Sequence, residues 1–349
     1  MNDNITPYVR YIGADDKDLD LFESQYVVPQ GISYNSYVIT DEKIAVMDTI
    51  DQRKTDEWTA RLEEALEGRT PDYLIVQHME PDHAANIGWF AEKYPEATIV
   101  ASAKAIQMMP QFFEEVNFAG RTQTVKEGDT LCLGQHTLKF IMAPMVHWPE
   151  VMLTYEESEK ILFSADAFGK FGALCHEGEW IDEARRYYFN IVGKYGAQVQ
   201  ALLKKAAGLD IAMICPLHGP VLKENLGYYI GLYDTWSKYE PETEGVVVAY
   251  ASIHGNTAAA ARRMAEILSE KGAAEVMLID LCRDDMALAV ESAFRYSKMI
   301  VAASSYDAGV FPPMFDFLHH LQIKNFQKRR VGIIENGSWA PTAGRMMSC

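Results

Sequence analysis

The sequence has few cysteines, and none of them stand at the spacing of a thiolate metal site or a redox pair. Its 349 residues contain only five: Cys132, Cys175, Cys215, Cys282 and Cys349. There is no C-x-x-C, and the scatter excludes a small disulfide framework. This usage is typical of reduced thiols in a cytoplasmic protein.

The sequence also lacks an excess of positive charge and long apolar runs. Its formal net charge is −17 and its pI is about 5.0, which argues against nucleic acid and anionic membrane as partners. No uninterrupted apolar run is long enough to span a bilayer, and Met1–Ile5 shows no start of a secretory signal. We therefore expect a soluble, cytoplasmic protein, long enough for two domains.

The most informative stretch that is present runs from Leu74 to His83. The apolar run Leu74–Val76 predicts a buried strand, and four potential metal ligands follow it within six residues. Residues two apart at a strand end point the same way, so His78 and Glu80 can reach one metal. Asp82 and His83, where the next helix begins, can reach a second. The alternative is a helix N-cap at Asp82 with bystander histidines.

Three further strands lead into residues of the same types. His147 follows a strand at 138–142, Asp166 ends the run 160–166, and His218 follows a strand at 211–215. One histidine at a strand end is more often a hydrogen-bonded loop residue than a ligand. Four strand ends that carry only His, Asp and Glu predict a site with two metals, since open sheets place their sites at such ends.

Other elements of the first part are predicted from hydrophobic period and turn residues. Tyr34–Thr40 and Lys43–Asp48 are expected to form a hairpin, in which Asn35 and Tyr37 either line the site or simply alternate along a strand. The remaining expectations are a strand at 8–12, a helix at 54–66, a helix at about 86–94, a strand at 98–101, a helix at 103–113 and one long helix at 183–206.

The last third resembles a nucleotide-binding sheet preceded by an acidic linker at 240–245. Val246–Tyr250 predicts a parallel-type strand, and the small polar loop after it can wrap a phosphate at the start of an Ala-rich helix. An ordinary capped helix start is the alternative. Two further strands, 299–303 and 331–334, each end in a loop that offers an aromatic side chain and small residues.

At this point the chain resembles the metallo-β-lactamase fold family, whose hydrolases carry H-x-H-x-D-H in the first loop. Here the loop reads His78-x-Glu80-x-Asp82-His83, and glutamate at the second place resembles the flavodiiron proteins. The resemblance implies an α/β protein with an αββα sandwich (α+β) at 1–244 and a doubly wound, flavodoxin-like sheet at 245–349. It implies one iron held by His78, Glu80 and His147, a second iron held by Asp82, His83 and His218, and Asp166 bridging the two.

The three loops of the second part resemble those that bind FMN in flavodoxins. The residues expected to contact FMN are Ser252, Ile253, His254, Gly255, Asn256, Thr257, Ser304, Ser305, Tyr306, Asp307, Ala308, Gly309, Ser338, Trp339 and Ala340. A flavodoxin has five strand–helix units, and only four strands are recognisable here. We therefore expect a flavin domain without its last strand and helix, whose fourth strand is an exposed edge.

The resemblance implies an oxidoreductase that reduces O2 to water or NO to N2O, with electrons passing from a rubredoxin-like donor through FMN. It also implies a head-to-tail homodimer or dimer of dimers, and a catalytic place for Tyr195 near the diatomic pocket. Two other functions stay open. One is a two-metal hydrolase with a flavin appendage, and the other is an electron-carrying or gas-sensing flavoprotein.

Overall fold

The computed structural model describes residues 4–176 and 178–348, which form two compact units. The first unit comprises residues 1–184 and 201–230, and the second comprises residues 185–200 and 231–349. The sequence places the boundary at 244/245, whereas residues 185–200 and 231–244 pack with the second unit. One reason is Arg185, which donates to Glu242 at 2.6 Å and to Glu291 at 2.8 Å.

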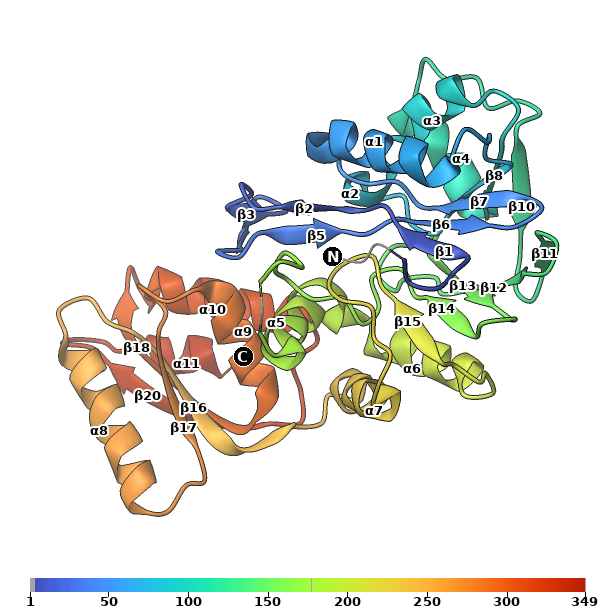
Figure 1. Ribbon diagram of the computed structural model, residues 1–349. Coiled ribbons are helices and arrows are strands. Elements are labelled where there is room, and N and C mark those ends of the chain that lie inside the picture. Colours follow the sequence, from blue (N-terminus) through green and yellow to red (C-terminus); the bar gives the residue numbers. More distant parts are fainter. Residues whose placement is uncertain (1–3, 177, 349) are drawn as a thin grey trace. The chain divides into compact units, whose positions relative to one another are not determined.

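The first unit contains a six-stranded sheet in the order β1-β6-β7-β8-β9-β10 (Figure 1). Strands β7, β8, β9 and β10 are parallel, so their carboxyl ends meet at one edge. Helices α1, α3 and α4 cover its outer face (Figure 1). The bounds are β1 Val9–Tyr11, β6 Tyr37–Thr40, β7 Ile44–Met47, β8 Tyr73–Val76, β9 Thr98–Ser102, β10 Thr122–Val125, α1 Thr55–Leu66, α3 Ile87–Lys93 and α4 Ala103–Phe112.

A second, five-stranded sheet in the order β11-β12-β13-β14-β15 lies face to face with the first. Apolar side chains of both sheets form one buried cluster, in which the ring of Tyr37 packs 5.4 Å from that of Phe163. This is the expected sandwich of two sheets. The bounds are β11 Thr130–Cys132, β12 Thr137–Met142, β13 Met152–Glu156, β14 Ile161–Phe163 and β15 Met213–Cys215.

The expected strand at 34–40 is in fact two strands. β5 (Ile32–Tyr34) pairs with β2 (Ala14–Asp16), while β6 belongs to the large sheet. A short hairpin of β3 (Leu21–Phe22) and β4 (Tyr26–Val27) lies between β2 and β5 in the chain. The chain leaves the strand path at Asn35 and Ser36, where both side chains are buried and hydrogen-bonded to other segments.

The single long helix expected at 183–206 is wrong. The segment is divided into α5 (Trp180–Tyr187), a π-helical turn at Tyr188–Val192, a 3-10 turn at Gly193–Tyr195 and α6 (Gly196–Ala206). Glycine weakens a helix interior. A Cβ at Gly196 would lie 2.3 Å from the carbonyl oxygen of Ser237, so the break allows this close approach to α7 (Leu226–Ser237).

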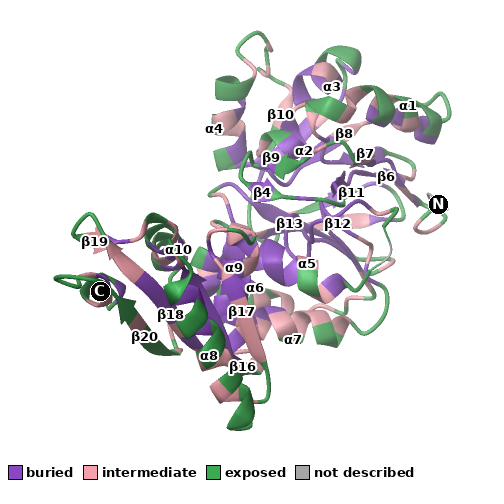
Figure 2. Ribbon diagram, turned by 90° about the vertical axis from the view of Figure 1, so that its left-hand side faces the viewer, coloured by how far each residue is buried: buried purple, intermediate pink, exposed green. Residues whose placement is uncertain are grey.

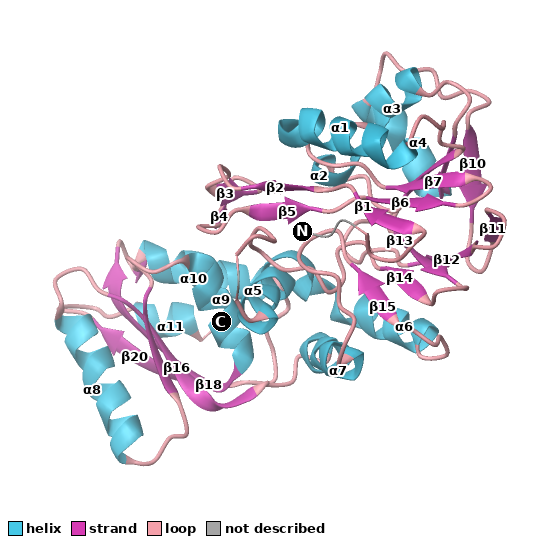
Figure 3. Ribbon diagram, in the orientation of Figure 1, coloured by secondary structure: helices cyan, strands magenta, loops and turns pink. Residues whose placement is uncertain are grey.

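The second unit contains a parallel sheet in the order β17-β16-β18-β20, with a short β19 paired to the end of β18. Helix α8 covers one face, and α9, α10 and α11 cover the other (Figure 3). The bounds are β16 Thr243–Ala251, β17 Val276–Asp280, β18 Tyr296–Tyr306, β19 Gly309–Val310, β20 Arg330–Asn336, α8 Asn256–Glu270, α9 Met286–Arg295, α10 Pro312–Ile323 and α11 Ala343–Met347.

Two details of this unit bear on the sequence predictions. The expected linker at 240–245 is corrected, because β16 already begins at Thr243 and Glu242 is fixed by Arg185. The expected exposed edge is confirmed: every residue of β20 except Ile334 is exposed, as the green of this strand in Figure 2 shows. Within the described part of the chain, no helix has both the length and the apolar character needed to cross a membrane.

Candidate metal centre and nucleotide pocket

The loop after β8 is fixed by a buried carboxylate. Asp48 accepts hydrogen bonds from the backbone N–H of Gln77 at 2.7 Å and of His78 at 3.3 Å, and from the Gln77 side chain at 2.8 Å. Burial raises the pKa of Asp48 to about 6. These contacts hold the end of the strand so that the next residues leave it toward the space between the sheets.

The following turn is the short helix α2 (Pro81–Ala84), and it carries two of the predicted ligands. Its N-cap residue is Glu80, not Asp82, and proline at the first position suits a helix start. Both carboxylate oxygens of Asp82 are buried without a hydrogen-bond partner among the described residues. The reading of Asp82 as a capping residue is therefore wrong.

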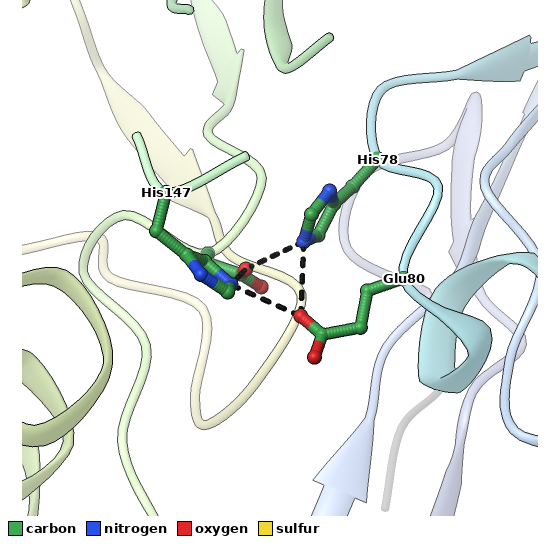
Figure 4. Close-up of side chains that lie close together, drawn as sticks. His78, Glu80 and His147 are labelled. Atoms are coloured by element: carbon green, nitrogen blue, oxygen red, sulfur yellow. Dashed lines mark hydrogen bonds and ion pairs between the residues drawn. The ribbon is translucent and has the colours of Figure 1, made fainter. Parts of the chain in front are cut away.

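The first of two ligand clusters consists of His78, Glu80, His147 and one oxygen of Asp166. Figure 4 shows the first three side chains pointing toward one another. Glu80 Oε2 lies 3.2 Å from His78 Nε2 and 3.0 Å from His147 Nε2. Asp166 Oδ2 lies 3.2 Å from each of the same two nitrogens. Four potential ligand atoms thus surround one point.

The second cluster consists of Asp82, His83 and His218. Asp82 Oδ2 lies 3.2 Å from the Nε2 atoms of both histidines, which are 3.1 Å from each other. The other oxygen of Asp166, Oδ1, is 3.3 Å from His83 Nε2 and 3.9 Å from His218 Nε2. Asp166 therefore faces one cluster with each carboxylate oxygen, as a bridging ligand would.

The state of these atoms fits two bound cations. Asp82 Oδ1 and Oδ2, His147 Nε2 and Asp166 Oδ1 are buried and have no hydrogen-bond partner among the described residues. Orphaned buried polar atoms are costly, and a cation in each cluster would satisfy them. Three carboxylates and four imidazoles form a hard, oxygen-rich set that suits iron.

The electrostatics of the centre are those of a site that attracts positive charge. Burial alone would raise the pKa of Asp166, but the neighbouring histidines outweigh it and hold the pKa well below its ordinary value. Burial alone would lower the pKa of His147, but the nearby carboxylates of Asp166 and Glu80 raise it to about 9. A proton and a metal ion would therefore compete for the same ring nitrogen of His147.

The loop that carries His218 is braced by two residues that the sequence left undecided. The Asn35 side chain donates to the carbonyl oxygens of Pro216 and Gly219, both at 2.8 Å. The Tyr37 hydroxyl donates to the carbonyl oxygen of Pro216 at 2.9 Å. Neither is a ligand; both position the loop that presents one.

Three residues near the centre were missed by sequence reasoning. Asp48 ends a predicted strand, Glu150 follows His147 by three residues, and Glu23 lies between β3 and β4. Burial and the charge of Glu80 raise the pKa of Glu23 to about 7, although part of this side chain reaches solvent. The sequence offered a usable signal only for Glu150, which is an acidic residue shortly after a candidate ligand.

The second unit contains a cavity of about 500 Å³ at the carboxyl ends of its strands. The buried Ser304 hydroxyl has no hydrogen-bond partner among the described residues. An orphaned hydroxyl in a concave site fits a polar cofactor such as FMN. The lining residues are Ser252, Ile253, His254, Asn256, Thr257, Ser304, Ser305, Tyr306, Asp307, Ala308, Asn336, Gly337, Ser338, Trp339, Ala340 and Thr342.

This cavity contains most of the residues predicted for FMN and adds three. Gly255 and Gly309 do not line it, whereas Asn336, Gly337 and Thr342 do. Gly255 has a φ of +90° as the N-cap of α8, a conformation that glycine adopts without strain. It shapes the loop instead of lining the cavity.

Tyr195, the predicted catalytic tyrosine, lies in the 3-10 turn Gly193–Tyr195 of the second unit. All seven predicted metal ligands lie in the first unit. Lys194 Nζ lies 5.9 Å from the centroid of the Tyr195 ring. A catalytic role for Tyr195 stays a prediction.

Comparison with known proteins identifies the family of this chain. Residues 32–219, more than half of the chain, match the family described as ODP family beta lactamase. The crystal structure of the flavodiiron protein from Giardia intestinalis is similar with a TM-score of 0.92 and 25% identity, over 98% of this chain and 85% of that one.

Two further relatives are similar over nearly the whole chain. The structure of rubredoxin oxygen:oxidoreductase from Desulfovibrio gigas has a TM-score of 0.93 and 26% identity, over 99% of this chain and 88% of that one. The anaerobic nitric oxide reductase flavorubredoxin of Aliivibrio fischeri is 29% identical, over 97% of this chain and 70% of the relative. The chain belongs to the flavodiiron proteins, oxidoreductases that combine a metallo-β-lactamase-like diiron domain with a flavodoxin-like FMN domain.

Proposed function

We propose that this protein reduces O2 to water or NO to N2O at two irons held in the first unit. In this proposal His78, Glu80 and His147 hold one iron, and Asp82, His83 and His218 hold the other. The observation that carries it is the carboxylate of Asp166, whose two oxygens lie 3.2 and 3.3 Å from histidines of different clusters.

The cofactors would store the electrons, and the residues of the chain would hold the cofactors in place. O2 needs four electrons to become two waters, which two irons and one reduced flavin can store together, while coupling of two NO molecules needs only two. Six of the seven ligand side chains are buried and Glu80 is half-buried, so these residues would hold two metals close together. Bound there, two irons would supply the redox and Lewis-acid chemistry that a diatomic substrate requires.

The donor and the assembly are part of the same proposal. The names of the relatives from Desulfovibrio gigas and Aliivibrio fischeri point to rubredoxin chemistry. We propose an external rubredoxin-like donor, a cytoplasmic location and a head-to-tail homodimer or dimer of dimers, in which the FMN cavity receives the electrons. Tyr195 is proposed to lie near the bound diatomic molecule.

The test begins with protein purified without oxygen. Metal and flavin analysis should find two irons and one FMN per chain, and an oxygen or NO electrode should record consumption when reduced rubredoxin is added. Two zincs without iron would favour the hydrolase instead. Iron and flavin without consumption above the donor's own background would favour an electron carrier or gas sensor.

A further inference from the structure

The two ligand clusters have the same inventory but different surroundings. Each contains two imidazoles and one carboxylate of its own, and they share Asp166. The direct ligands therefore give no reason for two irons to differ. The difference lies one contact further out, at the ring nitrogens that face away from the metals.

In the first cluster, the outward nitrogen of His78 meets a buried carboxylate. His78 Nδ1 lies 2.8 Å from Glu150 Oε1, and both side chains are fully buried. The carboxylate accepts the Nδ1–H, which leaves the lone pair of Nε2 facing the cluster. Because both side chains are buried, this charge-assisted hydrogen bond is shielded from solvent.

Glu150 is itself held from two sides. The backbone N–H of Met79 donates to the same Oε1 atom at 2.8 Å. The Ser102 hydroxyl donates to the backbone carbonyl oxygen of Glu150 at 2.7 Å. A carboxylate fixed in this way keeps its distance to the imidazole when the charge on a bound metal changes.

In the second cluster the outward ring nitrogens have different surroundings. His218 Nδ1 donates to the backbone carbonyl oxygen of Ser33 at 2.7 Å, which is a neutral acceptor. His83 Nδ1 is buried and has no hydrogen-bond partner among the described residues. The two clusters thus differ in the acceptor at an outward ring nitrogen, which is a buried carboxylate at His78 and a neutral carbonyl oxygen at His218.

We propose that Glu150 is a positioning residue that stabilises ferric iron at the His78/Glu80/His147 position, so that this iron is oxidised first. A carboxylate behind a ligating histidine raises the basicity of the ring. A buried anion also favours the more positive of two metal states, because little solvent screens it. The inference rests on the proposed iron ligands.

The experiment compares the wild-type holoenzyme with Glu150→Gln. Glutamine keeps an oxygen that can accept from both His78 and Met79 and removes only the charge. Loss of a partner of this kind costs about 10- to 100-fold in metal affinity, so excess iron should still fill both positions. We expect about tenfold weaker stabilisation of the ferric state, which raises the first iron potential by about 59 mV.

Two controls make the result specific. Glu63→Gln removes the same charge from an exposed carboxylate of the first unit, which pairs with Lys93, and should leave the potential unchanged. Glu150→Asp keeps the charge and should restore most of the wild-type potential. Mössbauer spectra of the half-oxidised protein should show the ferric signal of the first position weakened in Glu150→Gln only.

The outcomes separate this inference from the proposed function. Wild-type protein that binds no iron pair would overturn both. Two irons with an unchanged potential in Glu150→Gln, or an equal shift in Glu63→Gln, would overturn the inference alone. If Glu150→Gln fails to retain iron, a Glu150→Asp variant that retains iron but has a raised potential would overturn it as well.

Discussion

At the scale of single residues, the proposed bridging role of Asp166 depends most on exact geometry. Asp166→Ala removes the two oxygens that face different clusters, so magnetic coupling between the irons should disappear. Turnover should fall by at least about 100-fold, more than loss of an outer partner costs. EPR spectra, iron content and an oxygen electrode measure these effects.

The control for this change is Asp210→Ala, at an exposed carboxylate that pairs with Lys160 on the surface of the same unit. It should leave iron content, coupling and turnover as in the wild type. Coupled irons in Asp166→Ala would show that another group bridges them, and the ligand assignment would then need revision.

The two clusters of ligand-type side chains could be predicted from sequence because their signal is local. Residues His78 and Glu80 are two apart at a strand end, and each later ligand follows its own apolar run. The Glu150 contact could not be predicted in this way, because it joins residues 72 positions apart. Which acid lies behind which histidine is decided by the packing of two sheets, and no periodicity encodes it.

A second residue-scale prediction concerns Asp16, which is fully buried beside Arg53 at 2.6 Å. Burial alone would raise the pKa of Asp16, but the hydrogen bond and charge of Arg53 outweigh it and lower the pKa. A carboxyl with a lowered pKa stabilises the fold above its ordinary pKa, and this stability is lost as the pH falls through the folded-state value.

Arg53→Ala should therefore lower the free energy of unfolding by roughly 1–3 kcal/mol at neutral pH. The difference from the wild type should shrink below pH 3.8, the ordinary pKa of Asp16, as its carboxylate is protonated. Urea unfolding at several pH values measures it. A difference that does not change with pH would assign the effect to lost packing of the arginine stem.

At the scale of elements, the order of strands was predictable and the shape of one helix was not. Four strands of the second unit appear where apolar runs end in small polar loops, because both signals are local. The segment 183–206 carries a helical pattern throughout, yet it contains a π turn and a 3-10 turn. The backbone of Gly196 approaches Ser237, and only the folded structure shows that contact.

The edge strand β20 leads to an element-scale prediction. Ile279 in β17 is fully buried at one edge of the sheet, whereas Ile333 in β20 is 40% exposed at the other. Ile279→Ala should cost about 2–5 kcal/mol of unfolding free energy. The same substitution at Ile333 should cost less than about 1 kcal/mol, because much of its side chain already contacts water.

Thermal unfolding of both variants at the same protein concentration would measure the two losses of stability. Equal losses would mean that β20 is covered in solution by another chain or segment. In that case the cost of Ile333→Ala should depend on protein concentration, since a partner that binds only the folded state stabilises it by mass action.

At the scale of the whole molecule, each cofactor should stabilise the unit that contains its residues. All seven proposed iron ligands belong to the first unit and all residues of the FMN cavity belong to the second. Removing iron leaves buried carboxylates and imidazoles without partners, and removing FMN exposes a concave polar pocket. A protein of two units need not unfold in one step, so two transitions are expected.

Calorimetry of holoenzyme, iron-free protein and flavin-free protein would resolve the two unfolding transitions. Iron removal should lower the transition of the first unit and leave the temperature of flavin release unchanged. A ligand present at 100 times its dissociation constant contributes about 2.7 kcal/mol, enough for a shift of several degrees. If chelation of iron lowered the temperature of flavin release by the same amount, the two units would unfold together. Their stabilities would then not be independent.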